Sequence, residues 1–213
     1  MTDSRPPAMF LADAPGLDFL NSLAVPVDTE VEWLASGDDL LAWLEAAGLV
    51  ERETLDEIRR AAKPRELDAL AERARALREW WRGFVQRHRG KPLARSAASE
   101  LEPLNQLLAR DEAFAQVVAM AKSDMHEGEP PLALVSRRRW TSPEALLLPI
   151  ANAIAELVTS ADFADVKKCE GPTCVLHFLD TTRSRRRRWC SMAVCGNRAK
   201  QAAHRERLQQ AAR

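Results

Sequence analysis

The chain of 213 residues contains four cysteines, all of them between residues 169 and 195. Cys169 and Cys174 form one pair with four residues between them, and Cys190 and Cys195 form a second pair with the same spacing. Two such pairs can surround one tetrahedral ion, because each short loop supplies two sulfurs and the gap lets the loops face each other. The sequence therefore predicts that this stretch folds around one Zn²⁺ ion.

A complete set of four thiolates leaves no open coordination position, which favours a structural zinc ion over a catalytic one. An iron–sulfur cluster or redox-active thiols are the alternatives for the same cysteines. His177 lies between the two pairs. We interpret it as a strand side chain, because four sulfurs already complete the site.

The residues around the cysteines predict a small module of treble-clef type. Residues 175–179 and 185–189 are expected to form a β-hairpin with a turn at 180–184, and the Ala- and Arg-rich segment after Cys195 is expected to be helical. The apolar residues of the module are Leu176, Phe178, Trp189 and Val194. Because so few side chains can be buried, zinc must supply much of the folding energy, typically ~10–16 kcal/mol.

Charge divides the chain at about the same place. Residues 165–213 carry twelve Lys or Arg and four Asp or Glu, so the rest of this formally neutral chain has a net charge of −8. A Zn(Cys)4 centre needs about two cations for balance, so most of the basic residues have another role. Their density favours contact with the phosphates of a nucleic acid, and a solvated basic face or a surface for an acidic protein is the alternative.

The candidate nucleic-acid contacts lie on the predicted hairpin and on the helix that follows it. They are Arg183, Arg185, Arg186, Arg187, Arg188, Arg198, Lys200, Arg205 and Arg207.

The remainder of the chain predicts a mainly α (α+β) fold: a helical domain over residues 9–164, followed by the zinc module over 165–213. Apolar side chains recur at helical spacing, and caps and breakers mark the ends. The expected helices cover residues 15–23, 36–48, 51–62, 65–88, 99–109 and 143–158. Ser36 and Ser99 each begin a capping-box pattern, Ser142 is a candidate cap, and Gly48 and Gly90 are expected helix stops.

Residues 115–121 and 132–140 are expected to pair as a small β-hairpin across a loop at 123–131, with a helix at 115–121 as the alternative. Arg137, Arg138 and Arg139 suit a solvated strand end or a second nucleic-acid contact.

Asp18 and Asn21 lie three residues apart on a predicted helix. They are a candidate ligand-binding pair, and capping or interhelical hydrogen bonding is the alternative. His88 closes the apolar stripe of the longest predicted helix. Packing at a helix end is the simpler interpretation, and a metal or haem ligand is the alternative.

Several classes of protein do not fit this sequence. We expect a soluble, cytoplasmic protein without a membrane segment, since no apolar run reaches the ~18 residues that a membrane span requires. We do not expect an enzyme, since we find no nucleophile–base pair, phosphate-binding loop or open metal site.

The sequence also resembles a known bacterial family. Trp189-Cys190-Ser191-Met192, followed by Cys195-Gly196-Asn197-Arg198, resembles the CGNR zinc finger, and residues 17–22, 39–49 and 143–158 resemble the ABATE domain that precedes it. The resemblance implies that Cys169, Cys174, Cys190 and Cys195 are the zinc ligands. Ser22 departs from the threonine expected after Asn21 but keeps the hydroxyl.

Family members are described as stress-induced transcription regulators, and the resemblance implies that the finger binds DNA. We therefore expect a regulator that binds duplex DNA through the finger, with the helical domain sensing an unknown small-molecule effector or forming a homodimer. An RNA-binding or protein-interaction adaptor with a structural zinc module is the alternative.

Overall fold

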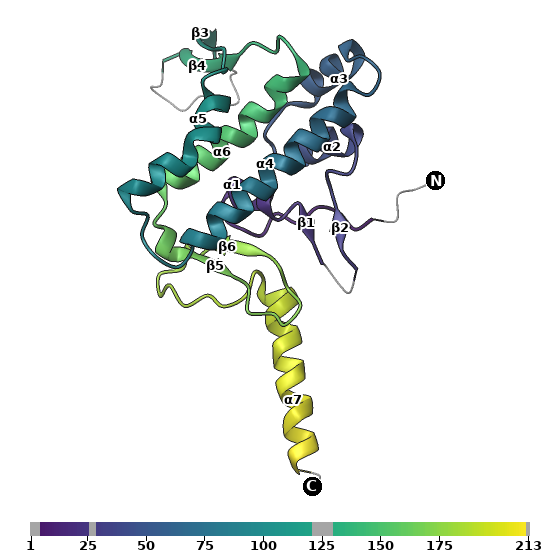
Figure 1. Ribbon diagram of the computed structural model, residues 1–213, viewed down its shortest axis with the longest axis vertical. Coiled ribbons are helices and arrows are strands. Elements are labelled where there is room, and N and C mark those ends of the chain that lie inside the picture. The colour runs from purple at the N-terminus through teal and green to yellow at the C-terminus, as the bar shows by residue number, and fades with distance from the viewer. Residues whose placement is uncertain (1–4, 26–28, 121–129, 212–213) are drawn as a thin grey trace.

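The structure is a computed structural model, and it describes residues 5–25, 29–120 and 130–211. The helices are α1 (Pro15–Leu20), α2 (Gly37–Ala46), α3 (Arg52–Ala61), α4 (Glu66–His88), α5 (Glu102–Leu108), α6 (Leu147–Ser160) and α7 (Asn197–Ala211). Helices α1 to α6 gather in one body, and α7 extends away from it as an isolated rod (Figure 1).

Short strands complete the fold and pair as antiparallel ribbons. These are β1 (Leu23–Ala24) with β2 (Val31–Glu32), β3 (Ala113–Ala119) with β4 (Leu132–Arg138), and β5 (Val166–Lys168) with β6 (His177–Leu179). The predicted class is confirmed: a mainly helical protein with small hairpins and a C-terminal zinc-finger module.

The short helix α1 lies at the centre of the core. Leu17, Phe19 and Leu20 are completely buried, and α1 contacts α6, α4 and β6. Trp81 of α4 donates from Nε1 to the carbonyl of Gly16 at 2.8 Å, which satisfies a buried polar group at the same place. The segment at 17–22 is therefore the element around which the long helices and the zinc module assemble.

Local signals placed the strongest helices correctly. The Ser36 hydroxyl accepts from the Asp39 N–H at 3.2 Å, and Asp39 accepts from the Ser36 N–H at 3.0 Å, so the predicted capping box is confirmed. Gly48, at φ 66°, and Gly90, at φ 78°, adopt the left-handed conformation expected at helix stops.

Two predicted helix starts were wrong in detail. Ser99 does not cap a helix: residues 95–101 form a 3-10 helix, α5 begins at Glu102, and the Ser99 hydroxyl donates to the Ser96 carbonyl at 2.9 Å. Residues 143–146 also form a 3-10 turn before α6, and Ser142 makes no side-chain cap. In both places proline lies in the first turn of the helix that forms, where its missing N–H costs nothing.

The predicted hairpin at 115–121 and 132–140 is confirmed as β3 and β4, so the alternative helix does not form. Its predicted loop at 123–131 lies, up to residue 129, outside the described residues. Arg138 forms a paired contact with the Asp111 carboxylate at 2.7 and 2.6 Å, and the Arg139 guanidinium lies 4.7 Å from the centre of the Phe114 ring.

The predicted pairing inside the zinc module was wrong. Strand β6 forms as expected, but its partner is β5, which precedes the first cysteine, and residues 185–189 form no strand. The reason is local: Arg185 adopts a left-handed conformation at φ 50°, and its N–H closes a turn onto the Thr182 carbonyl at 3.1 Å. A chain bent at this residue cannot run alongside β6.

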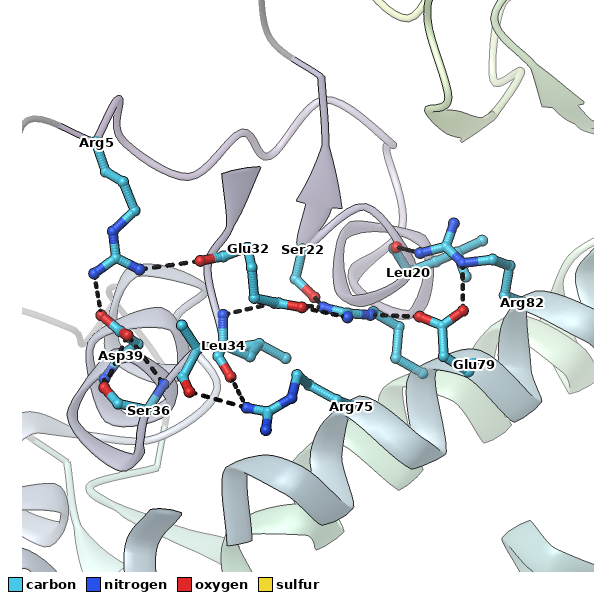
Figure 2. A network of polar contacts seen from close by, with 12 residues as sticks. Arg5, Leu20, Ser22, Glu32, Leu34, Ser36, Asp39, Arg75, Glu79 and Arg82 are labelled. Atoms are coloured by element: carbon cyan, nitrogen blue, oxygen red, sulfur yellow. Dashed lines mark hydrogen bonds and ion pairs between the residues drawn. The ribbon is translucent and has the colours of Figure 1, made fainter. Parts of the chain in front are cut away.

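A buried polar network ties the β1–β2 ribbon to α4, as Figure 2 shows. Arg78 of α4 is 2% exposed and forms a double contact with the Glu32 carboxylate at 2.7 and 2.6 Å. The same guanidinium donates to the Ser22 hydroxyl at 3.0 Å. The hydroxyl at position 22 is therefore required as a partner for a buried cation.

Candidate metal centre and basic surface

The four cysteine sulfurs converge on one point. Each lies within 4.8 Å of the other three, with 3.9 Å between Cys174 and Cys190 and 3.6 Å between Cys190 and Cys195. A tetrahedral ion with zinc–sulfur bonds of about 2.3 Å holds its sulfurs about 3.8 Å apart. The donor set and its spacing therefore fit zinc, and Cys169, Cys174, Cys190 and Cys195 would hold it.

The backbone around the sulfurs is shaped for this cluster. A Cβ at Gly171 would lie 3.0 Å from Cys174 Cβ and 3.2 Å from Cys195 Sγ, so the first loop passes too close to the sulfurs for any larger residue. The Cys174 N–H donates to the Gly171 carbonyl at 3.0 Å, and the Cys190 N–H donates to Cys169 Sγ at 3.2 Å. An amide hydrogen bond to a ligand sulfur stabilises its thiolate form.

The sulfurs also influence one another's protonation. Hydrogen bonds from Cys174 and Cys190 lower the pKa of the Cys169 thiol. The bond to Cys169 raises the pKa of Cys174 to about 12 and also raises that of Cys190, while burial raises the pKa of Cys195. Bringing all four to the thiolate state at neutral pH thus requires a cation at their centre, and a zinc ion would supply that charge.

The zinc module packs directly on the helical body. Asn21, the C-cap of α1, donates from its side-chain amide to the His177 carbonyl at 2.8 Å and accepts from the His177 N–H at 2.9 Å. Leu176 and Phe178 are buried in the same apolar cluster as the body, and the Leu179 N–H donates to the Ala12 carbonyl at 2.8 Å. The module therefore adds its few apolar residues to a shared core.

The candidate ligand pair, Asp18 and Asn21, is engaged within the protein. Asn21 holds β6, and the Asp18 carboxylate accepts from the Ala12 N–H at 3.0 Å. Burial raises the pKa of Asp18 to about 6. The two side chains thus make the intramolecular hydrogen bonds that the alternative interpretation described.

The predicted nucleic-acid arginines fall into two groups. Arg187 is 19% exposed and turned inward: its guanidinium lies 4.3 Å from the centre of the Phe178 ring, pairs with Asp13, and donates to the Leu11 carbonyl at 2.9 Å. Arg185 pairs with Asp165 at 3.3 Å and donates to the Asp180 carbonyl.

Arg185 is nevertheless 52% exposed, and the remaining predicted cations also lie at the surface. Arg188 forms an exposed ion pair with Glu170 at 2.6 Å. Arg183 and Arg186 are exposed, without a hydrogen bond or ion pair to any residue that the structure describes. Arg198, Lys200, Arg205 and Arg207 are exposed along α7.

Asp180 organises the arginine-rich loop, and the sequence analysis missed this role. Its side chain is completely buried and accepts from Lys167 Nζ at 2.6 Å, from the Thr182 hydroxyl at 2.6 Å and from the Arg187 N–H at 2.9 Å. Burial raises the pKa of Asp180, but these hydrogen bonds outweigh it and hold the pKa well below its usual range. The sequence offered one signal for this role, since Asp180 is an isolated acidic residue within a basic segment.

His88 stacks on Phe84, with ring centres 4.4 Å apart, and its Nε2 lies 2.9 Å from a carboxylate oxygen of Glu100. This is the packed, partnered position of a residue at a helix end.

No described helix is both long and apolar enough to cross a membrane.

Comparison with known proteins agrees with this architecture. Residues 166–208 match the model of the CGNR zinc finger, and residues 13–161 match that of the ABATE domain, whose description is "Putative stress-induced transcription regulator". No curated protein matches the chain. The second match alone covers well over half of the residues, and the cysteine cluster lies inside the first. The chain therefore belongs to the ABATE family and carries a C-terminal CGNR zinc finger.

Proposed function

We propose that this protein is a transcriptional regulator that binds duplex DNA through its zinc finger, with one structural Zn²⁺ per chain. The observation that carries the proposal is α7, a helix that projects from the body and has exposed cations along its length (Figure 1). The start of the helix contacts residues 192–196, which directly precede it, and the rest of the helix projects outward.

The spacing of the cations on α7 fits a helix placed between two phosphate backbones. Lys200 and Arg207 lie seven residues apart on one side, and Arg198 and Arg205 lie seven residues apart on the opposite side. The major groove of B-DNA, about 12 Å wide, admits one α-helix and has a phosphate backbone along each wall. Arg183 and Arg186, on the loop beside the zinc site, add further exposed cations.

Salt dependence tests this proposal. Fluorescence anisotropy of labelled duplex DNA should show an affinity that falls steeply with salt, with a slope of about −0.9 per phosphate contact. Arg186→Ala and Arg207→Ala should each make the slope shallower by about 1. Arg60→Ala, an exposed position on α3, is the matched control and should leave the slope unchanged.

Binding to no duplex at low salt, or slopes that do not change in Arg186→Ala and Arg207→Ala, would refute duplex binding. Parallel titrations with structured RNA and single strands test the adaptor alternative, because tighter binding to RNA would assign the basic surface to that partner. Because one helix reads few base pairs, we further propose a homodimer formed through the helical body, to be checked by sedimentation.

A further inference from the structure

His177 is a buried polar side chain whose ring makes no hydrogen bond of normal geometry, although the backbone of Val175 lies close enough to act on its pKa. It is 3% exposed, and neither ring nitrogen has a hydrogen-bond partner among the described residues. Buried polar groups are nearly always satisfied, so an orphaned imidazole calls for a ligand or a water. The four sulfurs already supply a full zinc coordination shell, so the metal site does not account for this ring.

His177 is one of the residues that line a cleft between the helical body and the zinc finger, and both of its ring nitrogens are buried. His177 of β6 lies directly opposite Lys168 of β5, so both side chains are on the same face of that ribbon. Both residues line a cleft of about 530 Å³. The facing wall is one stripe of α4 and its C-cap, with Arg82, Gln86 and Arg89 at intervals of four and three residues.

The cleft holds an excess of unsatisfied cationic donors. Arg89 and Lys168 are exposed and have no ion pair or hydrogen bond from their side chains within the part of the chain described. Arg82 donates from Nε to Glu79 at 3.0 Å and from Nη2 to the Leu20 carbonyl at 2.9 Å (Figure 2), which leaves Nη1 available.

The carboxylates at the cleft do not cancel this charge. Glu79 is already shared by Arg78 and Arg82, at 3.1 and 3.0 Å. Glu30 lies exposed at the rim. Burial first, and then the nearby Arg89, Arg82 and Lys168, lower the pKa of His177 to about 4, so the ring is neutral at pH 7 and can donate from one nitrogen and accept at the other.

We propose that this cleft binds a small organic anion, with Arg82, Arg89 and Lys168 contacting its carboxylate or phosphate group and His177 hydrogen-bonding a neighbouring polar atom. The volume lies within the ~300–1,000 Å³ typical of small-molecule sites. This site goes beyond the proposed DNA binding and would give the helical domain the effector-sensing role expected from the sequence.

The position of the site couples it to the finger. A ligand would contact α4 on one side and β5–β6 on the other, and Lys168 immediately precedes the zinc ligand Cys169. An anion bound across the two parts stabilises their docked arrangement, because it binds that arrangement in preference to an open one. The regulatory consequence, a change in duplex affinity when the cleft is filled, rests on the proposed DNA binding.

Ligand binding is tested on the full-length, zinc-loaded protein without nucleic acid. The probes are L-malate, glucose 6-phosphate and inorganic phosphate, with glucose as the neutral control and sodium chloride to hold ionic strength constant. We expect at least one anion to raise the melting temperature in a saturable manner and to give a measurable Kd by calorimetry. Malate and glucose 6-phosphate distinguish a carboxylate ligand from a phosphate ester, and inorganic phosphate shows whether the charged group alone is sufficient.

Arg89→Ala and His177→Gln should each weaken binding at least tenfold, whereas Arg60→Ala should leave it unchanged. Because Arg89 is exposed, its variant keeps the test valid even if His177→Gln does not fold. The ring ¹⁵N signals of His177 should also shift on saturation. The proposal is overturned if no anion exceeds the sodium chloride control, if Arg89→Ala binds equally well, or if the ring signals stay unchanged, which would assign the ring to water. Loss of duplex binding alone would leave this result intact.

Discussion

Arg187→Ala should destabilise the protein, although the residue lies in the segment predicted to contact nucleic acid. In the structure its guanidinium pairs with Asp13, donates to the Leu11 and Cys190 carbonyls, and stacks on Phe178 at 4.3 Å. These contacts join the N-terminal segment to the second cysteine loop. Truncation therefore removes a link between the zinc finger and the helical body.

The size of the effect can be estimated from the contacts. Each hydrogen bond that involves a charged group contributes about 1.5–3 kcal/mol when buried, and a cation–π contact adds about 0.5–2 kcal/mol. Because such contributions are not additive and the side chain is 19% exposed, we expect a net loss of about 3 kcal/mol. For a chain of this length, about 2–4 °C per kcal/mol corresponds to a fall of about 6–12 °C in melting temperature.

Calorimetry of the zinc-loaded protein measures this directly. Arg186→Ala is the matched control, because Arg186 is the exposed neighbour of Arg187 and its side chain has no hydrogen bond or ion pair within the described residues. The melting temperature of this variant should stay within about 1 °C of wild type. Arg187→Lys should recover only part of the loss, because an ammonium group cannot reproduce the several directed contacts of a guanidinium. Equal melting temperatures for Arg187→Ala and Arg186→Ala would refute the division of the arginines into structural and available groups.

Three further predictions concern the zinc site and its attachment. Metal analysis should give about one zinc per chain in the wild type and close to none in Cys190→Ala, which should lose the finger fold while the helical body remains helical by circular dichroism; an intact finger without metal would contradict this. Asp180→Asn should lower the free energy of unfolding by about 2 kcal/mol at pH 7. Because the folded pKa of Asp180 is depressed, the difference between wild type and variant should be constant above about pH 5 and shrink as pH falls below the unfolded value of about 4; a difference that grows in acid would be inconsistent. Asn21→Ala should accelerate hydrogen exchange at the His177 amide about tenfold or more, with Asn105→Ala on α5 as the control. Equal exchange in both variants would contradict the hydrogen-bonded link between Asn21 and the His177 backbone.

Much of the architecture could be predicted from local patterns. The Ser36 capping box, the stripe of α4 and the β3–β4 hairpin each depend on a pattern within one continuous segment of the chain, and all three were confirmed. The cysteine cluster was also predictable, because two short loops with fixed spacing allow only a narrow range of arrangements.

One of the failed predictions has a clear physical cause. Residues 185–189 were expected to pair with β6, but the buried carboxylate of Asp180 binds the Arg187 N–H and holds the loop in a bent conformation. Alternation within the segment says nothing about a buried acid that competes for its amide groups. The capping pattern at Ser99 also failed: residues 95–101 form a 3-10 helix, and the Ser99 hydroxyl donates to the Ser96 carbonyl instead of capping α5.

The sequence by itself determined the clustering of the four cysteines, most of the helices and the concentration of positive charge at one end of the chain. Only the tertiary structure decided which arginines are used internally, that Asn21 holds β6, and that His177 is buried beside the cations of α4. The first set depends on spacing along the chain, which the sequence records directly. The second depends largely on contacts between residues far apart in the chain, 62 positions for Leu20 and Arg82 and 176 for Leu11 and Arg187, and those contacts form only when the core packs.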